Sequence, residues 1–208
     1  MSVIARRAHR HRREDGSGAA GNERITALTG TFLLAGFAAE GVTILALGRL
    51  LTLHFFLGML LIGPVVLKLG STGYRFLRYY AGAGPYVRKG PPAPLMRALG
   101  PLVIITSLAV LGTGVMLAVT GPQPGHWLLL HKASFVLWFG VMTIHVLAYA
   151  WRVPRILLGA TAPGHGRPIV AGNAARWLLV GSSLAAGLLI ALLTIHLAAP
   201  WHAGPGSR

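Results

Sequence analysis

Long apolar stretches, separated by short polar connections, run through most of this chain. Each stretch meets or nearly meets the about 20 apolar residues that an α-helix needs to cross the hydrocarbon core of a bilayer. The pattern therefore predicts an all-α integral membrane helical bundle with five transmembrane helices and a short external tail at residues 200–208. The predicted helices cover residues 25–48, 50–69, 99–120, 127–150 and 174–199.

The polar segments refine this map. Residues 1–24 are basic and then rich in Gly, Ala and Ser, without a periodic apolar face, so we expect a disordered cytoplasmic tail. Residues 71–94 interleave Tyr and Phe with Arg, which beside a membrane helix indicates an interfacial segment on anionic lipid more than base stacking on RNA. In the second predicted helix Pro64 cannot donate to the carbonyl of Leu60, which predicts a kink.

Composition supports a membrane location and gives the bundle an orientation. Only 11% of the 208 residues are charged, whereas a soluble domain carries about 25%. The formal net charge is +15, and sixteen of the 19 Lys and Arg lie in the tail and in the connections after the second and fourth predicted helices. By the positive-inside rule the N-terminus is cytoplasmic and the C-terminus external. We expect a multi-pass protein of the bacterial inner membrane, with anionic lipid and not nucleic acid as the partner of these charges.

The scarce residue types limit the chemistry that the chain can perform. With no Cys there is no disulfide, no Cys-ligated zinc or iron–sulfur cluster, no covalently attached haem and no thiol nucleophile. The 4 acidic residues disfavour carboxylate-rich metal centres and paired-carboxylate hydrolysis. The 9 His residues are therefore the feature to follow.

Two histidines fall at the same depth of the predicted bilayer. His54 and His131 each lie four residues after the start of a predicted helix that runs from outside to inside. Two neutral imidazoles at equal depth on facing helices can ligate a haem iron from its two sides. The sequence therefore predicts haem b between His54 and His131, within a four-helix haem-binding core. The expected pocket walls are Phe55, Phe56, Gly58, Phe135 and Trp138.

A third histidine, His145, stands 14 residues after His131 on the same face of its predicted helix, about 21 Å further along the axis. It is a candidate ligand for a second, inner haem, but the first predicted helix has no His as a partner. Lys68, at the depth of His145, is a weaker candidate ligand, and we favour snorkelling to the cytoplasmic headgroups for it. The second haem therefore stays open, and His145 can instead hydrogen-bond a nearby Ser or Thr.

Two other polar residues lie inside predicted helices. His196 is near the outer end of the fifth, where it is a weaker candidate for an iron ligand or a quinone contact, and where we favour an ordinary interfacial His. Glu40 is the single acid inside a predicted helix, and intramembrane carboxylates are functional candidates by default. Two roles remain open for Glu40: accepting a proton during quinol oxidation, or hydrogen-bonding a neighbouring helix while protonated.

His54, His131 and His145 together resemble the ligand pattern of a known family. His-x13-His on one helix, matched by a His on an earlier helix, is similar to the membrane cytochrome b subunits of respiratory formate dehydrogenases and nickel–iron hydrogenases, and to related small bacterial di-haem cytochromes b. The resemblance implies that His131 and His145 ligate two stacked haems and that His54 is the ligand on the second helix. It covers roughly residues 25–151 and departs from the family at the first helix, where the inner ligand is missing.

The residues and the resemblance predict a membrane-embedded b-type cytochrome that transfers electrons between a quinone pool and a partner redox subunit. The chain has no nicotinamide, flavin or iron–sulfur module, so we expect an electron-transfer subunit and not an independent enzyme. Association with a second copy is left open. The alternative is a non-redox membrane scaffold or small transporter whose histidines form structural hydrogen bonds between helices. A transporter is disfavoured because no convincing internal repeat is found.

Overall fold

The structure, a computed structural model, describes residues 3–88, 90, 94–122, 125–149 and 173–203. All regular elements in these ranges are helical, and five helices are long and apolar enough to cross a membrane, which confirms the predicted fold class at this level. The elements are α1 (Val3–Ile44), α2 (Leu47–Tyr80), α3 (Gly84–Arg88), α4 (Pro94–Thr120), α5 (Trp127–Tyr149), α7 (Asn173–Thr194), η1 (Ile195–Ala198) and α8 (Ala199–His202).

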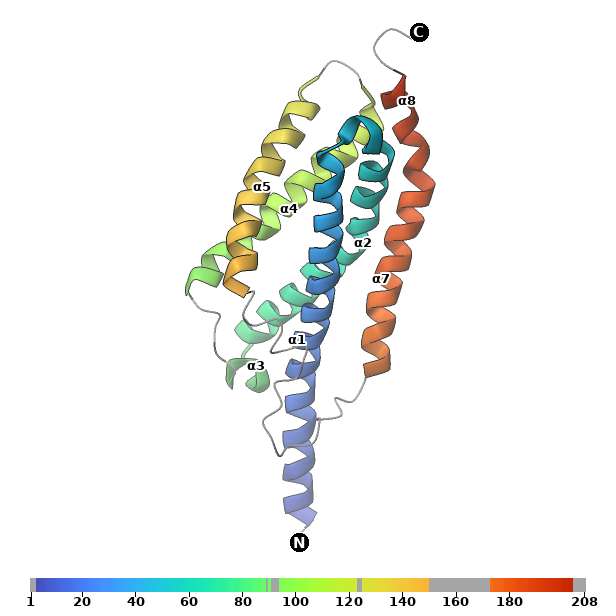
Figure 1. Cartoon of the computed structure of the whole chain (residues 1–208). Helices are drawn as coiled ribbons and strands as arrows, with labels where there is room; N and C mark the ends of the chain where they lie inside the picture. The colour runs from blue at the N-terminus through green and yellow to red at the C-terminus, as the bar shows by residue number, and fades with distance from the viewer. Residues whose placement is uncertain (1–2, 89, 91–93, 123–124, 150–172, 204–208) are drawn as a thin grey trace.

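The long helices run alternately up and down along one axis (Figure 1). The N-terminus and α3 lie at one end of the bundle, which we call the N-terminal end, and α8 lies at the other. α2 packs against both α1 and α7, while α4 packs against α5. The bundle therefore consists of a three-helix group and a helix pair, with the two groups meeting along α2 and α4.

The middle of α2 comes into backbone contact with α7. A Cβ at Gly63 would collide with the carbonyl oxygen of Ser183, and a Cβ at Gly187 would collide with that of Leu60. Small residues permit such backbone contact in membrane bundles, where packing and not hydrophobicity drives association. Pro64 follows inside α2, and beyond this contact α2 leans away from α7 toward α3 (Figure 1).

The N-terminal segment differs from its prediction. Residues 1–24 were expected to be disordered, but α1 begins at Val3 and continues into its membrane span at Gly21–Ile44. Once the span has formed a helix, extending it requires no new nucleation. Arg and Ala, which are frequent in residues 3–24, are good helix formers and favour that extension.

The segment after the second span also differs from its prediction as a loop. α2 continues to Tyr80, and its last turn is closed by Ala83 N–H, which donates to the Arg78 carbonyl at 3.0 Å. Gly82 adopts a φ of +73°, the left-handed conformation that ends helices and that other residues rarely adopt. The short helix α3 then folds back against α1 and α2. We call residues 74–88 the elbow.

The remaining predicted boundaries lie close to the observed ones. α4 begins five residues before its predicted start at 99, and the predicted external tail begins with the helix α8. The connection after the fourth predicted helix, with Arg152, Arg155 and Arg167, lies outside the described residues, as do residues 204–208.

Candidate functional site

His54 on α2 faces a carboxylate and a hydroxyl from α1. Its Nδ1 lies 2.9 Å from Thr43 Oγ1 and 3.1 Å from Glu40 Oε1. The Thr43 hydroxyl donates its own hydrogen to the Glu40 carbonyl at 2.5 Å, so its oxygen accepts from the ring. This arrangement fits a ring with its proton on Nδ1, and it leaves the lone pair of Nε2 for another partner.

His131 on α5 is held in the same way by α4. Its Nδ1 lies 3.1 Å from the Val110 carbonyl oxygen and 3.2 Å from Thr113 Oγ1. A carbonyl only accepts, so the proton is on Nδ1 here too. The Thr113 hydroxyl donates to the Ala109 carbonyl at 2.7 Å. A Cβ at Gly114 would lie 3.2 Å from the ring, so glycine at this position gives the imidazole its space beside α4.

The two rings meet although they are 77 residues apart in the chain. Their centroids are 6.4 Å apart and their planes are inclined at 76°. The equal depth predicted for His54 and His131 is therefore confirmed. In each ring the nitrogen that remains available is Nε2, and both rings are only partly buried.

The two rings are the residues here that could hold a haem iron. Two imidazoles that share one ion have centroids about 6 Å apart, and the 6.4 Å between these rings is of that order. Ligating histidines characteristically donate their other N–H to a carboxylate or a backbone carbonyl, as both rings do here. Among the described residues no group of three or more His, Asp or Glu could hold a bare metal ion. A haem needs only the two axial ligands, because its macrocycle supplies the other four.

Glu40 belongs to this cluster through its contact with His54. Its second carboxylate oxygen, Oε2, is buried, and no hydrogen-bond partner for it is found in the described part of the chain. Gly58 on α2 lies beside the carboxylate, since a Cβ there would be 3.3 Å from Oε1. The carboxylate therefore lies between α1 and α2 and does not point into lipid.

An aromatic layer closes the cluster toward the middle of the bundle. Phe37 on α1 packs on Trp138 of α5, with ring centroids 4.7 Å apart. Trp138 is buried, and its indole N–H donates to Ser107 on α4 at 3.1 Å. Trp138, expected as a pocket wall, thus forms the floor, one to two turns deeper than the histidines. Phe55 and Phe56 pack against the core around Met59, Ala118 and Ala191 instead.

Lys68 and His145, the candidate ligands of a second haem, are not arranged like the pair of His54 and His131. Lys68 Nζ donates to the Thr26 carbonyl on α1 at 2.6 Å and lies beside Gly30. It is also close enough to His145 to interact with it electrostatically. Because Nζ is turned to a carbonyl of α1, this geometry supports neither a Lys68 ligand nor the snorkelling that we expected. The residues here fit a second haem less well than those of the outer pair.

His196 lies on η1, where its side chain is exposed. It makes no ring contact with His54 or His131 among the interactions found in the described residues. Nearby, His202 Nε2 is 2.8 Å from Thr52 Oγ1 and ties α8 to α2. The exposure of His196 therefore agrees with its interpretation as an ordinary histidine at the membrane interface.

An open cavity of about 670 Å³ lies at the end of the bundle where α8 is found, between the end of α4, the start of α5 and Trp201, and neither His54 nor His131 lines it. Its walls include Trp127, Trp201 and His126, and its lining continues to Leu128, one turn before His131 on α5. This volume is within the range of small-molecule sites.

Sequence reasoning missed the two threonines that orient the rings. Thr43 follows Glu40 by three residues, so its place on the same face of α1 was readable from the spacing. Thr113 gave no comparable signal, because its partner lies on another helix. No protein-family model, curated protein or solved structure matches this chain.

Proposed function

We propose that this chain is a membrane cytochrome that holds one haem b between His54 and His131. The observation that carries the proposal is the pair of neighbouring imidazoles, 6.4 Å apart between centroids, each with Nδ1 occupied by oxygen atoms of its neighbouring helix. Structural histidines that merely join helices need no such neighbour. The resemblance to cytochrome b subunits, which rests on the same histidines, implies the same ligands.

The roles of the protein side chains follow from the contacts. His54 and His131 would bind the iron through Nε2, and the haem would supply reversible one-electron chemistry. Glu40 and Thr43 orient the first ring, while the Val110 carbonyl and Thr113 orient the second. The Phe37–Trp138 layer excludes water from the side facing the bundle middle.

The cellular role that we propose is electron transfer between a quinone pool and a partner redox subunit, in the bacterial inner membrane. The cavity beside Trp127 and Trp201 offers a place for a quinone ring at the boundary of the membrane. His145 and Lys68 are not assigned a haem, so the proposed stoichiometry is one haem per chain.

The proposal is tested by a reduced-minus-oxidised spectrum and a pyridine haemochrome assay on protein expressed with ample haem. We expect one haem b per chain, lost in His54→Ala and in His131→Ala. His196→Ala and His145→Ala are matched controls that should keep the full haem content. A protein that assembles normally without a Soret band would instead support the scaffold alternative, in which the histidines are structural.

A further inference from the structure

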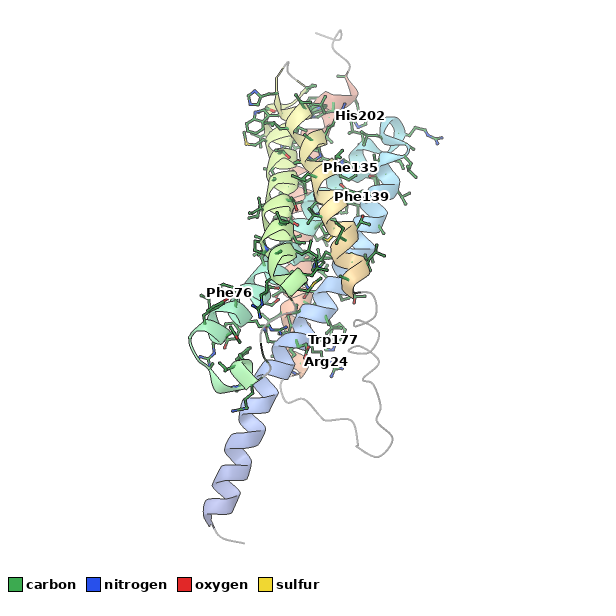
Figure 2. The ribbon with its side chains drawn as sticks, turned by 90° about the vertical axis from the view of Figure 1, so that its left-hand side faces the viewer. Arg24, Phe76, Phe135, Phe139, Trp177 and His202 are labelled. Carbon is green, nitrogen blue, oxygen red and sulfur yellow. The ribbon has the colours of Figure 1, made fainter. Side chains whose placement is uncertain are left out.

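The elbow carries an apolar face and a basic face on opposite sides of one helical segment. At about 100° per residue, Phe76, Leu77 and Tyr80 fall within one third of the α2 circumference, and Arg75 and Arg78 fall on the opposite side. The three apolar side chains are 60%, 66% and 71% exposed. Figure 2 shows Phe76 at the edge of the molecule, in the half of the bundle that holds Arg24 and Trp177, far from His202.

The length of α2 places this segment at the membrane boundary. Its 34 residues span about 51 Å, whereas the hydrocarbon core is about 30 Å thick. If the span starts near Leu47, the last dozen residues of α2 leave the core and enter the headgroup layer. The lean of α2 in Figure 1 carries them sideways, away from α7. Exposed Phe, Leu and Tyr side chains in the headgroup layer can insert between the neighbouring acyl chains.

Two of the three arginines of the elbow, Arg78 and Arg88, are exposed, and Arg75 is half-buried. The Arg78 guanidinium lies 6.0 Å from the ring centroid of the buried Tyr86, which in turn packs edge-on against Tyr74. Arg78 is itself exposed, and a guanidinium near a ring can still offer N–H donors to a phosphate. Arg88 at the end of α3 is also exposed and adds a third cation to the elbow.

We propose that the elbow is a binding site for anionic phospholipid, with Phe76, Leu77 and Tyr80 among the acyl chains and Arg75, Arg78 and Arg88 on the phosphates. Charge complementarity selects this occupant, because the basic face is suited to lipid phosphates and the apolar face to the acyl chains next to them. The proposal is independent of the haem.

The test uses a fluorescent reporter on the full chain. Since the sequence has no Cys, Val87→Cys provides a single labelling site in the elbow. The labelled protein is placed in vesicles of phosphatidylcholine and phosphatidylglycerol in equal amounts, and quenching by spin-labelled forms of each lipid is compared. Each arginine near an anionic surface favours association roughly fivefold, so we expect phosphatidylglycerol to be preferred by at least that factor.

The Arg75→Gln/Arg78→Gln variant should lose most of this preference. Arg24→Gln/Arg97→Gln removes the same charge from exposed positions outside the elbow and should keep it. High salt should weaken the preference in the protein with its native arginines, which tests the proposal even if a variant does not fold. Equal quenching by both lipids, an equal loss in the control variant, or a reporter shielded from both lipids by a protein partner would each overturn the proposal.

Discussion

The two histidines of the candidate site are oriented by different oxygen atoms, and this makes their supports unequal. His54 depends on two side chains, Glu40 and Thr43, whereas His131 has a backbone carbonyl as one of its two acceptors. A backbone acceptor cannot be removed by mutation. The ring on α2 is therefore the more sensitive of the two to changes in the residues around it.

Removing the carboxylate at position 40 is the direct test of this difference. Groups that orient metal-bound histidines typically contribute 10- to 100-fold to affinity, so Glu40→Leu should weaken haem binding by roughly that factor. Glu40→Gln keeps an acceptor for Nδ1 and should retain most of the haem. Thr113→Val should have a smaller effect than Glu40→Leu, because the Val110 carbonyl remains. Haem titration of the purified proteins measures all three, and unchanged affinity in Glu40→Leu would contradict the assigned role.

Tyr86, outside the membrane spans, gives the elbow a pH dependence. Burial raises the pKa of Tyr86, and the neighbouring Tyr74 adds to the rise while Arg78 opposes it. A phenol with a raised pKa in the folded protein stabilises the fold fully below its ordinary value of about 10. That stability is lost as the pH rises through the raised value. The difference in absorbance at the phenolate band between the native protein and Tyr86→Phe should show one group titrating above the ordinary value. A midpoint at or below it would be inconsistent with a buried Tyr86.

At the scale of elements, the contact between α2 and α7 depends on two glycines. Gly63 and Gly187 each lie against a main-chain carbonyl of the opposite helix, which cannot move aside as a side chain can. The pattern of apolar residues does not show where these two helices meet. The structure shows that Gly187 makes such a contact, whereas a Cβ at Gly112 or Gly140 would meet nothing within 4 Å.

Gly63→Ala and Gly187→Ala should therefore destabilise the bundle. Forcing a methyl group into a closed contact costs about 1–3 kcal/mol, and the two substitutions should not be additive because they affect one interface. Gly181→Ala is the matched control, since it lies on α7 with no atom within 4 Å of the added Cβ. Thermal unfolding in detergent followed by tryptophan fluorescence compares the three. Equal midpoints for all variants would show that the helices separate more easily than the structure implies.

For the whole molecule, the distribution of charge predicts the orientation in the membrane. The basic residues at the end of α2, on α3, at the start of the α1 span and at the starts of α4 and α7 belong to element ends at the N-terminal end of the bundle; they are Arg24, Lys68, Arg75, Arg78, Arg88, Arg97 and Arg176. Arg49 and Lys132 lie in the first two turns of α2 and α5, which begin at the opposite end. This grouping is the one that the positive-inside rule requires if the N-terminus is cytoplasmic.

The orientation is tested with single cysteines in a chain that has none. We expect Ala203→Cys, next to α8, to react with a membrane-impermeant maleimide in intact bacterial spheroplasts. Gly84→Cys, at the start of α3, should react only after the cells are opened. The reverse pattern would place the candidate haem site on the cytoplasmic side and would remove the basis for assigning the elbow to the inner leaflet.

The sequence by itself determined the number of spans, their approximate limits and the shared depth of His54 and His131. These follow from the constant rise of a helix and the fixed thickness of a bilayer, so counting residues from a membrane surface is enough. Outside the membrane, the thickness of the bilayer no longer limits the length of a helix, so counting residues does not predict where the helix ends. Residues 3–24 and 71–80 were consequently predicted as a disordered tail and a loop, and both are helical.

Only the tertiary structure decided which helix faces meet. Membrane helices are apolar on all sides, because lipid and neighbouring helices are equally apolar, so no stripe in the sequence marks the packed face. Three contacts could therefore not be predicted from the sequence: Thr113 with His131, Lys68 with the Thr26 carbonyl, and Gly63 with Ser183. The role of each of these residues depends on the residue that it contacts on another helix. That partner is set by how the helices are rotated and paired.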